Sequence, residues 1–406
     1  MKIIHLVLGK ANPDRMNGVN KVVHELATQQ ILHGDEAAVW GITAELSENY
    51  GERAFDTRLF RSARNPFGLP QGFEEALDAL PPMVVFHLHG GWIPVFATVG
   101  RVLSQRGIPF VLTAHGAYNR IAMQKSRLRK TLYFQVFEKQ LLRRAARVHC
   151  IGQSEMKGLA AICPKARTQL LPYGFQVTTK PQPRPANGHC VFSFVGRIDI
   201  HTKGLDLMVA AFRQLAMYSD HWEWHITGDG GERAALEQMV QQAGIGAKVV
   251  FTGSKFGAEK EAVLASADVF LHASRNEGLP ASVLEAASLG LPCIVTEATN
   301  VAGDVTAFGA GMAIPDNDAD ALADVLRTLL DAWQRNELAA LRQNSRRMVL
   351  ERFGWPGLLE SYRAMYAGAS CGRCEPGGSA AWRFYTPRRV GRPTAGMRPK
   401  QNPSTI

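Results

Sequence analysis

The stretch Ser274-Arg275-Asn276-Glu277-Gly278-Leu279-Pro280-Ala281-Ser282-Val283-Leu284-Glu285 decides how this chain is expected to fold. The mostly apolar residues 268–273 precede it and predict a buried strand, and a helix is predicted to follow. Pro280 suits the first position of that helix, where its missing N–H costs nothing. Glu277 is therefore expected on a loop at the carboxyl end of a parallel strand, where open α/β sheets bind ligands, and Glu285 in the helix behind it.

The same stretch allows a plainer interpretation. Ser282 and Glu285 have the spacing of a helix-capping box, and Glu277 could be an ordinary loop carboxylate. A helix start with free backbone N–H groups would instead favour an anion at this place. The rest of the chain has to decide between the two.

Length and composition are those of a globular chain with more than one core. The chain has 406 residues, and 46% of them are hydrophobic. No apolar run approaches the roughly 18 residues needed to span a bilayer. Residues 2–8 are too short for the apolar part of a signal peptide and predict a first strand. We therefore expect a cytoplasmic protein whose six cysteines are reduced thiols.

The net charge of +10 is unevenly distributed. Residues 120–147 contain nine lysines and arginines against one glutamate, with apolar residues at helical spacing. We expect one or two helices there, with a basic face that is either solvated or in contact with an anionic membrane surface. Residues 368–406 are rich in glycine, proline and arginine without periodicity, so we expect a disordered tail that could also bind nucleic acid.

Strand and helix patterns alternate through both halves of the chain. This alternation predicts two parallel sheets with helices on both faces. The proline-rich residues 178–188 interrupt it and predict a linker. The predicted parts are an N-terminal Rossmann-like domain at 1–175, a linker at 176–190, a C-terminal Rossmann-like domain at 191–352, a helix at 353–367 that packs back towards the N-terminal domain, and the basic tail at 368–406.

Three patterns could hold a metal ion, and each has a competing interpretation. His87 and His89 share one face of a predicted strand, but no third ligand is evident nearby. Residues 316–318 read Asp-Asn-Asp directly before a predicted helix, which favours helix capping. Cys371 and Cys374 form a single C-x-x-C pair, which supplies too few ligands for a zinc site. We expect no metal site.

Taken together, motifs within residues 1–367 resemble the retaining nucleotide-sugar glycosyltransferases of family 4, which have the GT-B fold. They stand in the family's order: Asn17-Gly18-Val19, Phe194-Val195-Gly196-Arg197, Lys203-Gly204, Gly228-Asp229-Gly230, Phe251-Thr252-Gly253, and the Glu-x7-Glu of Glu277 and Glu285. Two further segments are similar to bacterial enzymes of exopolysaccharide and lipid-linked glycan assembly: Thr113-Ala114-His115-Gly116 and Thr299-Asn300-Val301. The family's Asn-Gly near the linker is replaced by Pro172-Tyr173-Gly174-Phe175. The resemblance implies two Rossmann-like domains that face each other across a cleft.

The resemblance also implies a role for each matching residue. Arg197 and Lys203 would hold the diphosphate, whose negative charge grows as the sugar–phosphate bond breaks. Glu277 would hold the sugar hydroxyls, and Glu285 the ribose hydroxyls, because a carboxylate can accept two hydrogen bonds. The donor site would be completed by backbone groups, by a histidine of the opposite domain and by two residues near the base; these are Gly18, His115, Gly196, Lys255, Phe256, Gly278, Leu279 and Ala281.

The implied activity is a metal-independent, retaining transfer of a sugar. The sugar would pass from a nucleotide-diphosphate sugar to a hydroxyl of a glycan or polyprenyl-linked acceptor, in exopolysaccharide or cell-surface polysaccharide biosynthesis. We expect no further cofactor, no nucleic acid, and a place at the inner face of the plasma membrane. Alternatives are a GT-B sugar-nucleotide epimerase, which needs no acceptor, a phosphorylase, and a nucleic-acid-binding protein that uses the tail.

Overall fold

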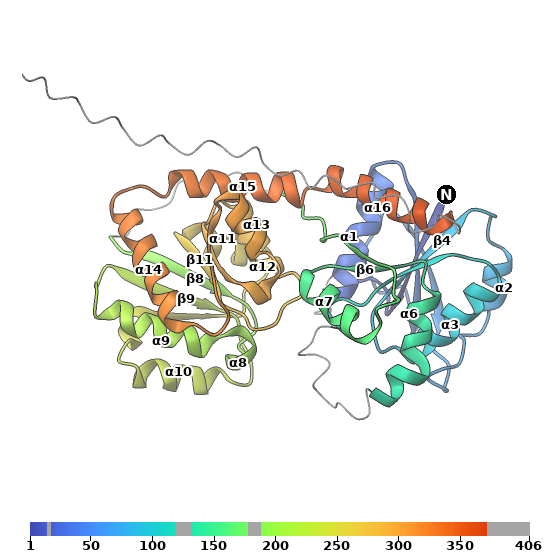
Figure 1. Ribbon diagram of the computed structural model, residues 1–406, viewed down its shortest axis with the longest axis horizontal. Coiled ribbons are helices and arrows are strands. Elements are labelled where there is room, and N and C mark those ends of the chain that lie inside the picture. The colour runs from blue at the N-terminus through green and yellow to red at the C-terminus, as the bar shows by residue number, and fades with distance from the viewer. Residues whose placement is uncertain (14–17, 119–130, 178–187, 372–406) are drawn as a thin grey trace, which may run out of the picture. The chain divides into compact units, whose positions relative to one another are not determined.

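Each half of the chain is built on its own parallel β-sheet (Figure 1). The computed structural model describes residues 1–13, 18–118, 131–177 and 188–371. We call the part around the first sheet the first domain and the part around the second sheet the second domain. The predicted fold class, two Rossmann-like α/β domains, is confirmed.

The first sheet has seven strands in the order β3-β2-β1-β4-β5-β6-β7, all paired in parallel. Its strands are β1 (Lys2–Leu8), β2 (Glu36–Thr43), β3 (Asp56–Arg61), β4 (Val84–His89), β5 (Phe110–Thr113), β6 (Arg147–Cys150) and β7 (Thr168–Leu170). The helices along this part of the chain are α1 (Gly18–Leu32), α2 (Phe73–Asp78), α3 (Pro94–Gln105), the π-helix η1 (Phe134–Glu138), α6 (Lys139–Arg144) and α7 (Gln153–Ile162).

The second sheet has six parallel strands in the order β10-β9-β8-β11-β12-β13. Its strands are β8 (Cys190–Val195), β9 (Trp222–Thr227), β10 (Val249–Gly253), β11 (Val269–His272), β12 (Cys293–Thr296) and β13 (Gly311–Ile314). The helices are α8 (Ile200–Lys203), α9 (Leu205–Ala216), α10 (Arg233–Gln242), α11 (Gly257–Ser266), α12 (Ala281–Ser288), α13 (Ala302–Phe308), α14 (Ala319–Gln334), α15 (Ala339–Arg352) and α16 (Trp355–Ser370), with the short 3₁₀ turns η2 (Gly246–Lys248) and η3 (Glu297–Thr299).

Alternating side chains divide the first sheet into two buried faces. On β1, Ile4 and Leu6 belong to the large core formed with α2, α3 and α6. Ile3 and Val7 point to the other face, where α1 and α16 cover the sheet. This division follows from the two-residue period of a strand, and both faces of the sheet are buried under helices.

The last helix, α16, packs against the first sheet although it follows the second domain in sequence. Trp355, Tyr362 and Tyr366 are buried in one cluster with Ile3 of β1 and with residues of β4 and β5. Figure 1 shows α16 along that sheet and α15 over the second domain. The helix extends to Ser370, into the segment that the sequence analysis assigned to the tail.

Several local expectations need adjustment. Residues 43–80, which have weak patterning, contain β3 and α2. Pro280 is the N-cap of α12 rather than its first residue. Cys190 begins β8 and does not belong to the linker, whose residues 178–187 lie outside the described residues. The tail from residue 372, and residues 119–130 of the basic stretch, lie outside them as well.

Within the described residues, none of the helices combines the length and the apolar composition that crossing a membrane requires.

Candidate active site

The loop after β11 carries the carboxylate of Glu277 to the carboxyl edge of the second sheet. All residues of β11 are buried, and Ser274, which follows the strand, is fully buried too. The Ser274 hydroxyl donates to the Thr202 carbonyl at 2.8 Å, and the Thr296 hydroxyl donates to the Ser274 carbonyl. These hydrogen bonds attach the loop to α8 and to the end of β12. They therefore fix the position of the backbone that carries Glu277.

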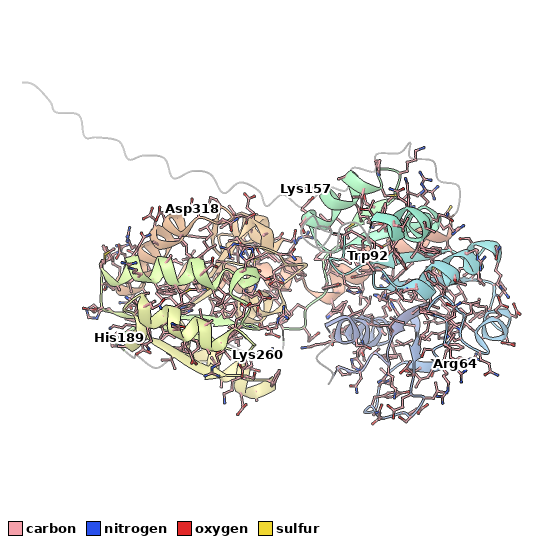
Figure 2. All side chains as sticks on the ribbon, turned by 90° about the horizontal axis from the view of Figure 1, so that it is seen from below. Arg64, Trp92, Lys157, His189, Lys260 and Asp318 are labelled. Carbon is pink, nitrogen blue, oxygen red and sulfur yellow. The ribbon has the colours of Figure 1, made fainter. Side chains whose placement is uncertain are left out.

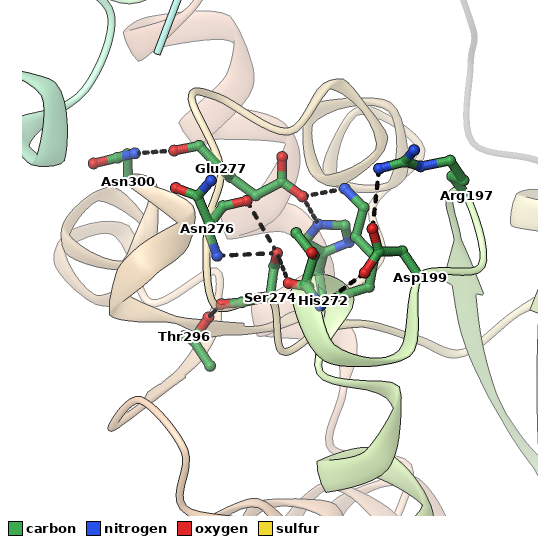
Figure 3. A network of polar contacts seen from close by, with 10 residues as sticks. Arg197, Asp199, His272, Ser274, Asn276, Glu277, Thr296 and Asn300 are labelled. Carbon is green, nitrogen blue, oxygen red and sulfur yellow. Dashed lines mark hydrogen bonds and ion pairs between the residues drawn. The ribbon is translucent and has the colours of Figure 1, made fainter. Parts of the chain in front are cut away.

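Two basic side chains contact the same oxygen of Glu277 (Figure 3). Lys203 Nζ forms an ion pair with Oε1, and His272 Nε2 donates to Oε1 at 2.9 Å. Burial favours a raised pKa for Glu277, but the hydrogen bond and charge of His272 and the charge of Lys203 outweigh it and lower the pKa to about 2. Glu277 is therefore a carboxylate at neutral pH and acts as a hydrogen-bond acceptor.

Lys203 reaches Glu277 because a glycine follows it. Asp199 caps α8 by accepting the Thr202 N–H at 3.0 Å, and α8 ends at Gly204 with φ 66°. A Cβ at Gly204 would lie 2.0 Å from the carbonyl oxygen of Ala273, at the end of β11. Only glycine accepts both this left-handed conformation and this close approach, so the Lys203-Gly204 pair brings the cation against the Glu277 loop.

The other predicted cation, Arg197, does not contact Glu277. Its side chain is 70% exposed, and Nη2 donates to Asp199 Oδ2 at 3.1 Å, as Figure 3 shows. Arg197 follows Gly196 directly after β8, so it lies beyond the same edge of the sheet as Lys203. Gly196 itself is approached closely by the next strand end, since a Cβ at Gly228 would lie 1.8 Å from the Gly196 carbonyl oxygen.

The second glutamate, Glu285, is held on α12 by a residue that the sequence analysis did not select. Lys260 Nζ of α11 forms an ion pair with Glu285 Oε1 at 2.7 Å, and Figure 2 labels Lys260 in the second domain. Lys255 pairs with Glu259 at 3.6 Å, and Phe256, the N-cap of α11, is 64% exposed. The structure thus places the two predicted base-contacting residues on the surface beside α11.

The start of α12 lies behind the Glu277 loop. Gly278 has Ile151 of the first domain next to it, where an added Cβ would meet Cδ1 at 2.7 Å. Leu279 packs against the core of the second domain, and Ala281 is the first residue of α12. In the described part of the chain, no acceptor is found for the backbone N–H groups of Gly278 and Leu279.

Asn300 fixes the backbone of this loop from behind. Its Nδ2 donates to the carbonyl oxygens of Glu277 at 2.7 Å and Gly278 at 2.9 Å, and its Oδ1 accepts the Ser154 N–H at 2.9 Å. Asn300 itself is in the left-handed conformation, with φ 62°. The sequence analysis noted Asn300 only within a resemblance and gave it no role.

A cavity of about 280 Å³ opens at the carboxyl edge of the first sheet, where β1, β4 and β5 end. Apolar side chains and two imidazoles surround it; its lining consists of Val7, Leu8, Val19, His89, Gly90, Gly91, Ile93, Ala114, His115 and Ala117. His115 follows β5 and has φ 56°. Its Nε2 lies 3.2 Å from Nδ1 of His89, and its Nδ1 bonds the Tyr173 hydroxyl. Gly18 is the first residue of α1, and none of the described residues comes within 4 Å of a Cβ added to it.

The structure bears on two of the three possible metal sites. Asp318 accepts the Ala321 N–H at 2.8 Å and caps α14, so the capping interpretation of residues 316–318 is confirmed. His87 and His89 gain a third histidine, His5 of β1, and the three rings offer nitrogens within 4.8 Å of one another. The sequence analysis missed His5, because the register of β1 against β4 brings it there.

The two halves of the chain match different family models. Residues 17–174 match the model described as glycosyl transferase 4-like domain, and residues 177–348 match the model described as glycosyl transferases group 1.

Among individual proteins, the chain is 32% identical over 205 residues to a 2-deoxystreptamine glucosyltransferase of Streptomyces kanamyceticus, a match covering 46% of this chain and 52% of that protein. The match thus spans about half of that relative's length. This chain is also 26% identical over 383 residues to a GDP-mannose-dependent alpha-mannosyltransferase of Mycobacterium tuberculosis. That match covers 87% of this chain and 93% of the other protein.

The fold is shared with solved structures at low sequence identity. A sucrose-phosphate synthase from Thermosynechococcus elongatus superimposes with a TM-score of 0.69 at 22% identity, covering 90% of this chain and 100% of the other. Anabaena HepE in complex with UDP also gives a TM-score of 0.69, at 16% identity and the same coverage. Through the two models, which match residues 17–174 and 177–348, the chain belongs to the glycosyltransferases.

Proposed function

We propose that the protein is a retaining glycosyltransferase that moves a sugar from a nucleotide-diphosphate sugar to a hydroxyl of a glycan or lipid-linked acceptor. The observation that carries this proposal is the ion pair of Lys203 with Glu277 at the carboxyl edge of the second sheet. It joins a cation suited to a diphosphate to a carboxylate suited to sugar hydroxyls. The names of relatives, glucosyltransferase and mannosyltransferase, support the same class of activity.

Lys203 and Arg197 would act on the leaving diphosphate. As the bond between sugar and phosphate breaks, negative charge grows on the phosphate oxygens, and a fixed cation lowers the energy of that state. Backbone N–H groups of Gly278 and Leu279 at the start of α12 would add donors. With these groups supplying the positive charge, we propose that no metal ion or other cofactor is needed.

Glu277 would position the sugar. Its ion pair and hydrogen bond both use Oε1, so in the described residues Oε2 is left to accept from a sugar hydroxyl. Because its pKa is about 2, Glu277 has no proton to give at neutral pH and does not act as a general acid. Glu285 would accept from the ribose hydroxyls, and His115 would contact the sugar from the first domain.

Removing the Lys203 ammonium tests this assignment. For Lys203→Ala we expect transfer to fall by about 10²-fold or more, the usual cost of losing one group that stabilises transition-state charge. The measurement is release of UDP from UDP-glucose and of GDP from GDP-mannose, after a thermal-shift screen has shown which donor the wild-type protein binds. Arg335→Ala, which removes an exposed cation paired with Glu337, is the control.

Unchanged transfer by Lys203→Ala would contradict the assignment. Donor turnover that needs no acceptor and returns an isomerised nucleotide sugar would favour the epimerase.

We also propose that the surface around η1 and α6 contacts an anionic membrane and helps to present a lipid-linked acceptor. Leu132 is 70% exposed and Val136 is 45% exposed, and they lie one helical turn apart. Arg143 and Arg144 of α6 are exposed as well. Apolar side chains next to cations are what a helix that lies on an anionic surface needs.

Vesicle sedimentation tests the membrane contact. We expect the protein to sediment with phosphatidylserine vesicles at low salt, and less with phosphatidylcholine vesicles or at high salt. The double variant Leu132→Ser, Val136→Ser should reduce sedimentation and leave the melting temperature unchanged, because both side chains are exposed. Equal sedimentation with both vesicle types would count against this proposal.

A further inference from the structure

A stripe of polar side chains crosses the face of the first sheet that packs against α1 and α16. It runs over four neighbouring strands, and each member is at most 2% exposed: His5, His87, His89, Thr113 and His149. The sheet register pairs His5 with His87, His89 with Thr113, and Thr113 with His149. Burying such groups is costly unless each is hydrogen-bonded, so their partners should explain why the stripe exists.

The direction of the hydrogen bonds is set at one end of the stripe. His149 Nε2 lies 2.7 Å from the carbonyl oxygen of Leu171, which can only accept, so Nε2 carries the proton. In a neutral ring Nδ1 is then an acceptor, and it accepts from the Thr113 hydroxyl at 2.7 Å. Thr113 Oγ1 in turn accepts from His87 Nε2 at 2.6 Å.

Helices α16 and α1 supply the next links of this hydrogen-bond chain. His87 Nδ1 accepts from the Tyr366 hydroxyl at 2.8 Å. The Tyr366 oxygen then accepts from Gln30 Nε2 at 3.4 Å, which turns the Gln30 amide so that Oε1 faces His5. His5 Nε2 donates to that Oε1 at 2.7 Å. The two helices that cover this face therefore each supply one link.

The last links lead to the cavity. His5 Nδ1 accepts from His89 Nε2 at 2.9 Å, and His89 Nδ1 accepts from His115 Nε2 at 3.2 Å. His115 Nδ1 is left to accept, and its donor is the Tyr173 hydroxyl. One direction thus satisfies every ring nitrogen from Leu171 to Tyr173, with all five histidines neutral and protonated at Nε2.

Burial supports neutral rings. It lowers the pKa of His5 and His149 to about 4 and that of His115 to about 3, and it lowers the pKa of His87 and His89 well below the usual value. The spacing of His5, His87 and His89 would also suit a metal ion. All six nitrogens of these three rings already take part in hydrogen bonds, which a metal ion would have to displace. The three rings therefore fit the hydrogen-bond chain better than they fit a metal site.

We propose that His89 is a positioning residue whose Nδ1 accepts the hydrogen bond from His115 Nε2–H, which keeps the His115 proton on Nε2 and leaves His115 Nδ1 as an acceptor. This rests on the proposed function, in which a substrate hydroxyl reaches His115. In the free protein the Tyr173 hydroxyl occupies that acceptor; in the complex a sugar or acceptor hydroxyl replaces it as the donor. The buried hydrogen-bond chain behind His89 keeps the His115 ring in one tautomer and one orientation.

Nitrogen NMR of the protein labelled with ¹⁵N-histidine tests the tautomers directly. We expect the five histidines of this hydrogen-bond chain to show a protonated Nε2 and a bare Nδ1 from pH 6 to 8. A His115 protonated at Nδ1, or charged, would overturn the proposal. Binding of one equivalent of added Zn²⁺ with a shift of the His5, His87 and His89 nitrogens would also overturn it.

Two tyrosines one turn apart on α16 form a matched pair. Tyr366→Phe removes the hydroxyl that joins Gln30 to His87. Tyr362→Phe removes an equally buried hydroxyl, which among the described residues bonds only the Pro172 carbonyl, at 3.4 Å. We expect Tyr366→Phe to give His115 a mixture of tautomers, and Tyr362→Phe to leave the nitrogen spectrum unchanged. The same nitrogen spectrum for both variants would show that the hydrogen-bond chain does not control the tautomer of His115.

Activity provides the functional readout. His89→Phe keeps a ring of similar size without nitrogens, and we expect kcat for the donor that the wild-type protein turns over to fall by about 10²-fold through misplacement of His115. Wild-type kcat in a folded His89→Phe variant would overturn the positioning role. If the wild-type protein shows the five tautomers but turns over neither UDP-glucose nor GDP-mannose, the proposed function fails while the tautomer assignment holds.

Discussion

His272 shows how a single residue can matter to the site without any signal in the sequence. It ends β11, a strand that the sequence analysis interpreted only as buried and apolar, and it stacks on Phe194 and Phe270 with ring planes 15° and 12° apart. The stacking turns Nε2 towards Glu277, whereas Nδ1 is buried without a partner among the described residues. A histidine that is buried and also bonded to the candidate sugar-binding carboxylate supports that carboxylate.

Replacing His272 with phenylalanine should weaken the candidate site without unfolding the domain. The ring can still stack, but Glu277 loses a hydrogen bond from a charged or polar donor, worth about 1.5–3 kcal/mol. Because the His272 hydrogen bond lowers the Glu277 pKa, its loss raises that pKa, and the acid limb of the pH–activity profile should move to higher pH.

The control is His225→Phe, which removes a histidine bonded to Glu223 at 3.0 Å within β9 of the same sheet. We expect the control to keep the wild-type pH profile. Identical profiles for both variants would mean that His272 does not act through Glu277.

At the scale of elements, glycines at element ends decide how closely loops approach. Gly204, at the end of α8, presses the turn against the Ala273 carbonyl, and Gly174 lies against Trp355, where an added Cβ would meet the indole at 2.3 Å. The first contact places Lys203, and the second helps to seat α16. Of the two glycines, Gly204 belongs to a motif that the sequence analysis selected, because glycine marks turns that other residues cannot form.

Gly204→Ala should cost more than the conformational penalty alone. A left-handed alanine costs about 1–2 kcal/mol, and here the new Cβ also meets backbone at 2.0 Å. Gly244→Ala is the matched control, because Gly244 has a similar φ of 74° after α10, but none of the described residues lies within 4 Å of a Cβ added there.

We expect urea unfolding to show a larger loss of stability for Gly204→Ala, and nucleotide-sugar binding to weaken in that variant only. Equal stability losses in the two variants would mean that α8 can shift at no cost.

On the scale of the whole molecule, the core of the first domain contains a group of five buried histidines. Burial lowers the pKa of each of them. The helix α16 belongs to this acid-sensitive part, since it covers the histidine face of the first sheet. The carboxyl groups of Glu138 and Glu155 lie in the same domain and have raised pKa values.

The first domain should therefore lose stability on mild acidification. A histidine with a lowered pKa stabilises the folded state fully above pH 6.5, and this contribution is lost as the pH falls from 6.5 towards about 4, the pKa of His5 and His149. Glu155, whose pKa burial raises to about 7, has the opposite sign and gains stability as the pH falls. Five histidines outnumber two carboxyls, so the net effect is a loss.

Hydrogen exchange followed by mass spectrometry at pH 7 and pH 5 measures this loss. After correction for the intrinsic exchange rate, we expect peptides of β1, β4 and α16 to lose more protection at pH 5 than peptides of β8 and β9, which contain none of the five histidines. Equal losses in both sheets would contradict the prediction.

The amino-acid sequence by itself determined the features that depend on neighbours along the chain. Alternating strand and helix patterns predicted two parallel sheets, and the Lys203-Gly204 and Glu277 motifs pointed to one edge of the second sheet, because βα connections place loops after parallel strands on the same edge. The roles of the predicted donor contacts stay predictions, those of Lys203 and Glu277 as well as those of Arg197, Glu285, Lys255 and Phe256.

Only the tertiary structure decided which distant residues meet. His5 joins His89 across 84 residues, Tyr366 reaches His87 across 279, and Lys203 meets Glu277 across 74. These contacts depend on strand register and on the return of α16 to the first sheet, and both are set by packing of whole faces. A local pattern carries no information on such pairings, because the same alternation of residues is compatible with many partners.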